Sequence, residues 1–168
     1  SRPVRGIDPA QFLRAYYANI DDQDLVERTP ADLVALAGSH LRFAQRRRGR
    51  ALVRVFNPSL EQDGYVSPHT VVELVNDDMP FLVDSIGLVL SKCGLTMHFL
   101  AHPVLAVERA RNGLIKSLEP RDENAQAGAQ KLESFQHFEI DRIVDATEMR
   151  SLCQEIEGSM RDVRIVCA

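Results

Sequence analysis

Two adjacent aspartates, Asp77 and Asp78, are the first candidates for acid–base chemistry that we consider in this sequence. They lie in the stretch VVELVNDDMPFLVDSIG, between an apolar segment and Pro80. Asp84 follows about two helical turns later, so the three carboxylates form no evident catalytic pair. As the N-cap of a helix, Asp78 would face the positive end of the helix dipole, with Pro80 in the first turn. We therefore predict that Asp78 caps a helix and takes no part in catalysis.

Asp77 is open to two interpretations. In a turn between a strand and a helix, its carboxylate could accept a hydrogen bond from a partner chain or from the ammonium group of an amino acid. It could equally be a solvated loop acid. Ser85 lies in VDSIG and not in a GxSxG elbow, so it is interpreted as an ordinary helical serine. We predict no catalytic residue.

The five histidines give no recognisable metal-binding motif. His98 and His102 share a face of one predicted strand but stand about 13 Å apart, too far to bind one ion together. His40 lies on the apolar stripe of a predicted helix, where a hydrogen-bonded core histidine is expected. His69 and His137 are alone in their motifs. The sequence also contains neither GxGxxG nor a P-loop, so we predict no metal site and no cofactor-binding residue.

The composition is that of a soluble globular domain. The chain has 168 residues, of which 45% are hydrophobic, and no apolar run approaches the length of a membrane span. A net charge of −4 argues against a broad nucleic-acid surface. The basic cluster at 46–50, RRRGR, is interpreted as a solvated helix end, the alternative being a phosphate or RNA site. We expect neither a nucleic-acid nor a membrane partner.

Three cysteines, Cys93, Cys153 and Cys167, are widely spaced in apolar patterns and form no CxxC arrangement. We interpret them as buried thiols. The first residues, SRPVRGIDPAQF, lack the regions of a signal peptide, so a cytoplasmic location is expected.

Hydrophobic periodicity predicts an alternation of helices and strands along the chain. Helices are predicted near 8–20, 29–47, 79–93 and 145–160, and strands near 51–56, 70–76, 95–107, 114–118, 133–143 and 163–167. Asn112 and Gly113 are typical of a hairpin turn. The segment 119–131 has almost no apolar residue larger than alanine and is expected to be a mobile loop.

With 114–118 counted as a brief return of the long strand 95–107, the predicted order from residue 70 onward is strand, helix, strand, strand, helix, strand. This is the βαββαβ plan of the ferredoxin-like fold, an α+β architecture in which two helices cover one face of an antiparallel sheet. Right-handed crossovers place the first and third strands at the centre. We thus expect an N-terminal helical segment, 1–50, and a ferredoxin-like domain, 51–168, whose core is 70–168 and which has one extra strand at its start.

The turn NDDMPFL, in this topology, resembles the ACT domain, a βαββαβ module whose first strand ends in an acidic residue before a proline-containing helix start. The segments SHLRFAQRR, VRVFNPSLEQDGY, TVVELVNDDMPFLVDSI and HPVLAVER together resemble the N-terminal region of the large bacterial NAD-dependent glutamate dehydrogenases. The resemblance covers residues 10 to 168.

This resemblance implies a function that composition and spacing do not give. The family oxidises L-glutamate to 2-oxoglutarate and ammonia with NAD in glutamate catabolism, and its catalytic portion lies far downstream of the region that this chain resembles. The chain itself is then a regulatory or assembly domain without catalytic residues, and a purely structural oligomerisation module is the alternative. The implied partners are other domains of the same polypeptide, a second copy bound through the sheet edges, and an amino-acid effector.

An effector or an interface would lie at the first strand-to-helix turn, formed by Asn76, Asp77, Asp78, Met79, Pro80 and Phe81. The common ACT motif has glycine directly after the proline, which lets a small amino acid approach the backbone. This chain has Phe81 there, and we expect its ring to fill part of the effector site.

Overall fold

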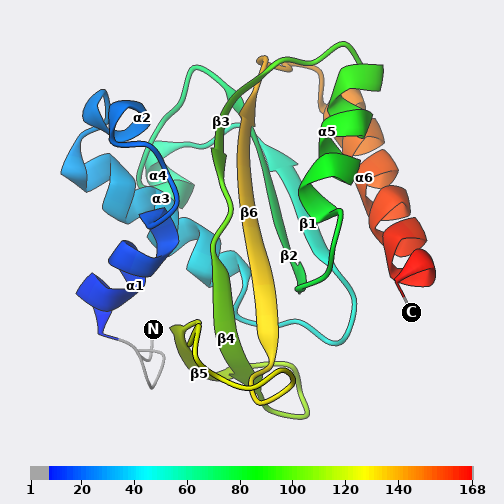
Figure 1. Ribbon diagram of the computed structural model, residues 1–168. Coiled ribbons are helices and arrows are strands. Elements are labelled where there is room, and N and C mark those ends of the chain that lie inside the picture. Colours follow the sequence, from blue (N-terminus) through cyan, green and yellow to red (C-terminus); the bar gives the residue numbers. More distant parts are fainter. Residues whose placement is uncertain (1–7, 168) are drawn as a thin grey trace.

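The sheet that organises this protein is antiparallel and has the strand order β1-β2-β6-β4-β5, with β3 also pairing with β6 (Figure 1). The structure is a computed structural model that describes residues 8–167. Its strands are β1 (Leu52–Phe56), β2 (Thr70–Asp77), β3 (Met97–Ala101), β4 (Val104–Arg109), β5 (Ile115–Pro120) and β6 (Leu132–Ile140). Its helices are α1 (Pro9–Tyr17), α2 (Asp22–Val26), α3 (Pro30–Phe43), α4 (Leu60–Asp63), α5 (Leu82–Lys92) and α6 (Ala146–Val166).

Strands β2 and β6 form the centre of the sheet, which confirms the prediction for the first and third strands of the repeat. Residue pairing runs from Thr70 opposite Ile140 to Asp77 opposite Glu133. Because side chains alternate between the two faces of a strand, β2 sends Val72 and Leu74 to one face and Val75 to the other. Both faces of β2 are therefore buried.

Helices cover both faces of this sheet. Helices α5 and α6 pack on one face, where Ile86, Phe138 and Ile156 belong to one apolar core, as expected for the two helices of the repeat. Helices α1 and α3 pack on the other face, where Tyr16 and Leu36 belong to a second core with strand residues (Figure 1). The N-terminal helices therefore share a core with the sheet. No described helix combines the length and apolar character that a membrane span needs.

The long strand predicted at 95–107 is broken into β3 and β4 at His102 and Pro103. Both parts pair with β6, so the break is a bend within one sheet. The predicted hairpin is present, because β4 and β5 pair on either side of Asn112 and Gly113. A side chain at Gly113, whose φ is 86°, would lie 2.5 Å from the Arg47 carbonyl oxygen, so glycine is required there.

The prediction of a closing strand at 163–167 is wrong. Helix α6 continues to Val166, since Val163 extends the apolar helical stripe formed by Leu152, Ile156 and Met160. The edge beside β2, where the closing strand would lie, is occupied by β1, whose Leu52 pairs with Val75. The fold is thus an α+β sheet in which an N-terminal strand takes the position of the expected last strand.

This correction can be tested with two matched truncations in α6. Met160 is 2% exposed and packs in the core, so Met160→Ala should lower the free energy of unfolding by about 2–5 kcal/mol. Ile165 is 75% exposed, so Ile165→Ala should change it by less than about 0.5 kcal/mol. Urea unfolding measures both. A large cost at Ile165 would instead support a strand that turns Ile165 toward the core.

Candidate functional site

The turn between β2 and α5 begins later than the sequence predicted. Strand β2 continues through Asp77, and the Asp78 N–H still donates to the Leu132 carbonyl oxygen of β6 at 3.0 Å. Helix α5 therefore starts at Leu82, and its N-cap is Phe81, which makes no side-chain capping hydrogen bond. The assignment of Asp78 as the helix cap is wrong, because its N–H still bonds to β6 directly after the strand and the helix begins four residues later.

Asp77 lies between two arginines of its own chain. Its carboxylate accepts hydrogen bonds from Arg47 and, at 3.1 Å, from Arg164 of α6. Arg47 is 5% exposed and also pairs with Glu133 at 3.3 Å. Helix α3 ends at Phe43, so the basic cluster at 46–50 lies beyond the helix and joins it to the sheet. A solvated helix end therefore does not describe Arg47.

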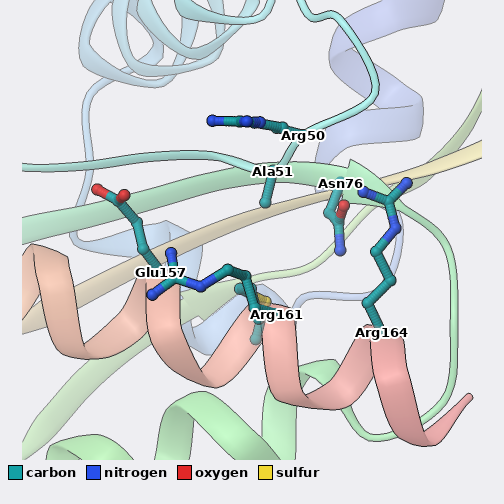
Figure 2. Close-up of a pocket in the computed structure, with 7 residues that line it drawn as sticks. Arg50, Ala51, Asn76, Glu157, Arg161 and Arg164 are labelled. Atoms are coloured by element: carbon teal, nitrogen blue, oxygen red, sulfur yellow. The ribbon is translucent and has the colours of Figure 1, made fainter.

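Asn76 faces a cavity of about 360 Å³ between β2 and α6. Its side chain is 3% exposed, and its Oδ1 accepts no hydrogen bond from a described residue. The cavity is lined by Arg50, Ala51, Glu157, Met160, Arg161 and Arg164 in addition to Asn76 (Figure 2). An unpaired amide oxygen among guanidinium groups can accept a hydrogen bond from a polar ligand while the arginines bind its anionic group.

Of the six predicted turn residues, only Asn76 lines this cavity, and Asp77 is connected to it through its ion pair with Arg164. Met79 packs against the core beneath α5, whereas Pro80 is exposed. Phe81 is 63% exposed and does not line the cavity, so its ring does not fill the space beside Asn76. Its φ of 68° makes Phe81 the one non-glycine residue of the described chain in the left-handed region. That conformation is the one that a glycine at this place would adopt freely.

A second group of polar side chains is buried between the sheet and the N-terminal helices. Glu73 of β2 is 0% exposed and lies opposite His137 of β6, with the His137 Nδ1 atom 2.8 Å from Glu73 Oε2. Arg54 of β1 donates to Glu73 Oε1 through Nε at 2.9 Å. A buried carboxylate is tolerated only when it is paired in this way.

The same group extends to α3 and to the segment before it. His137 Nε2 lies 3.1 Å from Glu139 Oε2, and Glu139 accepts two hydrogen bonds from the Arg28 guanidinium, at 2.7 and 2.9 Å. The hydroxyl of Tyr16 lies 2.5 Å from His40 Nδ1, and His40 Nε2 lies 3.0 Å from the Leu74 carbonyl oxygen. We call Tyr16, Arg28, His40, Arg54, Glu73, His137 and Glu139 the buried polar cluster.

Burial and charge act in opposite directions on the pKa values of this cluster. Burial lowers the pKa of His40 to about 4, so His40 is neutral and donates from Nε2 to Leu74. Burial alone would raise the pKa of Glu73, but His40, His137 and Arg54 outweigh it and hold that pKa at about 2. Burial opposes protonation of His137, whose pKa is nevertheless raised because both ring nitrogens face carboxylates. Glu73 is therefore ionised beside a protonated His137.

The remaining histidines lie outside the cluster. His69 and His98 stack with ring centroids 4.2 Å apart, and His98 Nε2 lies 2.7 Å from Asp141 Oδ1. His102 Nε2 lies 2.9 Å from the Ser134 hydroxyl, so His98 and His102 serve separate contacts. Two of the three cysteines, Cys93 and Cys167, are exposed, which contradicts the prediction of buried thiols, and Cys153 is half-buried.

No sequence motif marks the buried polar cluster, because its members come from helices and strands far apart in the chain. His40 was correctly placed in the core, yet its carboxylate neighbour, Glu73, lies in a run of apolar residues that marks only a buried strand. One signal was available. An ionisable residue within such a run requires a buried partner of opposite charge, although the run does not say which.

Comparison with known proteins assigns this fold to a class. Residues 12–156 match a family model described as the glutamate dehydrogenase ACT1 domain. No solved structure matches the chain. The match and the observed α+β sheet define an ACT-like domain, as the resemblance of the turn implied.

Two curated relatives are named NAD-specific glutamate dehydrogenase. The protein of Pseudomonas aeruginosa is 35% identical over 158 residues, which cover 94% of this chain and 10% of the relative. The protein of Halomonas elongata is 34% identical over 153 residues, which cover 90% of this chain and 9% of the relative. The chain belongs to the ACT1-domain family of glutamate dehydrogenase, and it spans about a tenth of the length of these relatives.

The left-handed backbone conformation of Phe81 should lower the stability of the folded chain, and this can be tested. Phe81→Gly should raise the free energy of unfolding by about 1 kcal/mol, because glycine adopts a positive φ without a Cβ clash. Phe81→Ala is the matched control, since it removes the same exposed ring but keeps the Cβ atom. Urea unfolding compares the two. An equal gain in both variants would show that the exposed ring, and not the backbone, carries the cost.

Because His40 is neutral in the folded chain, we expect the free energy of unfolding to depend on pH. The measurement uses buffers with a chelating agent, so that no metal ion binds the histidines. Because its folded pKa is about 4 and its ordinary value is 6.5, the stability that His40 contributes is present above pH 6.5 and is lost as the pH falls toward 4. His137 acts oppositely, since its raised pKa makes its contribution decline as the pH rises through the folded pKa.

NMR of the histidine ring protons between pH 7 and pH 3 checks this expectation. One ring should titrate near pH 4, and its signals should be missing from His40→Gln. Titration of every histidine ring above pH 5 would contradict the assignment of His40 as a neutral core residue.

Proposed function

We propose that this chain is a regulatory and assembly domain of an NAD-specific glutamate dehydrogenase and performs no chemistry itself. The whole enzyme would oxidise L-glutamate to 2-oxoglutarate and ammonia with NAD bound in a downstream catalytic part. Family membership supports this proposal, together with relatives about ten times longer than the matched region. The domain would act by changing the state of the catalytic part or by holding subunits together.

The regulatory role rests on one observation, the unpaired Oδ1 of Asn76 in the cavity beside α6. We infer that an amino-acid effector binds there. Its carboxylate would pair with Arg50 and Arg161, whose side chains form no ion pair with a described residue, and its ammonium group would donate to Asn76. Arg164 already pairs with Asp77, so an effector near it would couple the cavity to the β2–α5 turn.

The assembly role rests on the sheet edge at β1. This strand pairs with β2 along one side only and ends the strand order, which leaves its outer edge open to another chain. The opposite edge strand, β5, is less open, because the Ile115 N–H already donates to the Gln45 carbonyl oxygen. A second copy, or another domain of the same polypeptide, would therefore add to β1.

An amino-acid screen tests the regulatory role. A ligand that binds the folded state raises the unfolding temperature by mass action, so at least one amino acid at millimolar concentration should produce a shift. Arg161→Ala should abolish this shift. Arg150→Ala, on the same helix and outside the cavity, should preserve it. The absence of any shift, or equal shifts in both variants, would count against an effector in this cavity.

Hydrogen exchange at low and high protein concentration tests the assembly role. Edge pairing should slow exchange of outward-facing amides of β1 as the concentration rises, while β5 should change little. Light scattering on the same samples gives the mass. A monomeric mass at every concentration, together with unchanged hydrogen exchange in β1, would rule out self-assembly through this edge.

A further inference from the structure

Two histidines of the buried polar cluster direct the same ring atom at one carboxylate oxygen. His137 Nδ1 lies 2.8 Å from Glu73 Oε2, and His40 Nδ1 lies 3.7 Å from that oxygen. One ligand atom from each of the three residues, all buried, lies within 4.8 Å of the others. Because they come from α3, β2 and β6, the fold alone brings them together, and any separation above about 4 Å has to shorten for all three atoms to contact one zinc ion.

The far nitrogen of each imidazole is held by an acceptor. His40 Nε2 donates to the Leu74 carbonyl oxygen, and His137 Nε2 donates to the Glu139 carboxylate, which Arg28 fixes in turn. Metal-bound histidines show this arrangement, in which a carbonyl or carboxylate binds the second N–H and orients the ring. Both Nδ1 atoms are thereby fixed toward the interior.

Glu73 and Tyr16 complete a set of four donors. Arg54 occupies Oε1 of Glu73 and leaves Oε2 to the histidines. The Tyr16 hydroxyl is 2.5 Å from His40 Nδ1 and supplies a second oxygen. Tetrahedral zinc with bonds near 2.0 Å places its ligand atoms about 3.3 Å apart. Three of the separations, 2.5, 2.8 and 3.7 Å, lie on both sides of that value and differ from it by less than about 1 Å.

The charge of the cluster also permits a divalent ion. With His137 protonated, three cations, Arg28, Arg54 and His137, face the two carboxylates of Glu73 and Glu139. A divalent ion that displaces one proton from His137 Nδ1 and one from the Tyr16 hydroxyl leaves the net charge unchanged. Both protons pass to solvent, and no other bond breaks.

We propose that His40, Glu73, His137 and Tyr16 form a structural site for a divalent transition-metal ion of the zinc class, which links the N-terminal helices to the sheet. Two imidazole nitrogens with two oxygens suit zinc and cobalt better than magnesium or calcium. Because the donors are buried, the ion enters while the chain folds.

Refolding of the denatured chain with Co²⁺ or Zn²⁺ tests this site. We expect one ion per chain after gel filtration, visible Co²⁺ absorption bands typical of tetrahedral coordination, and two more protons in solution per bound ion than after refolding without metal. His137→Gln should weaken binding by roughly 100-fold or more. His98→Gln and His69→Gln, which remove the exposed stacked histidines, should leave it unchanged.

Tyr16→Phe keeps the aromatic ring in the core and is the second test variant, to be used if His137→Gln does not fold. It should bind the ion with an altered Co²⁺ spectrum and release one proton instead of two. The absence of bound metal after refolding, equal affinity in His137→Gln, loss of binding in the surface variants, or an unchanged spectrum and proton count in Tyr16→Phe would each overturn the proposal.

Discussion

The burial of Glu73 is the constraint on which the rest of this structure depends. A carboxylate in the central strand of a sheet covered on both faces requires compensation, because an unpaired buried charge costs several kcal/mol. Arg54 compensates it from the neighbouring edge strand and His137 from the other central strand. The position of β1 at the sheet edge thus serves two purposes, since it completes the sheet and delivers the arginine that Glu73 needs.

The same charge explains why the N-terminal helices belong to the sheet. Tyr16 and His40 approach Glu73 from α1 and α3, and Arg28 reaches Glu139 from the segment between α2 and α3. Aromatic packing supports these guanidinium groups, because Arg28 lies 3.9 Å from the centroid of Phe99 and Arg54 lies 4.0 Å from that of Phe56. Hydrogen bonds and apolar packing together therefore hold the N-terminal helices against the sheet.

The two faces of β2 differ in their polar environment for this reason. Glu73 and Val75 face the N-terminal helices, where the Glu73 carboxylate finds its partners within the chain. Asn76 faces α6, where its amide oxygen finds none. Strand β2 therefore borders the buried polar cluster on one face and the cavity on the other. At its C-terminal end, Asp77 pairs with Arg47 and Arg164. A ligand in the cavity would act on the residues that also anchor the basic segment after α3.

The sequence by itself determined the local structure and the family. Periodicity placed α3, α5 and most strands, Asn112 and Gly113 gave the hairpin, and the NDDMPFL turn led to the ACT-like resemblance, because each of these depends on neighbours in the chain. Tertiary structure decided the rest. Val163, Ile165 and Cys167 alternate like a strand, but Val163 completes a helical stripe that only the packed core reveals. Asp78 is of a residue type that often caps helices, yet its N–H bonds to Leu132 of β6 and the helix starts only at Leu82. Sequence pattern could likewise not predict the partners of Glu73 or the unpaired oxygen of Asn76. The fold decides which residues come near a buried polar group, and these can be far away in the sequence.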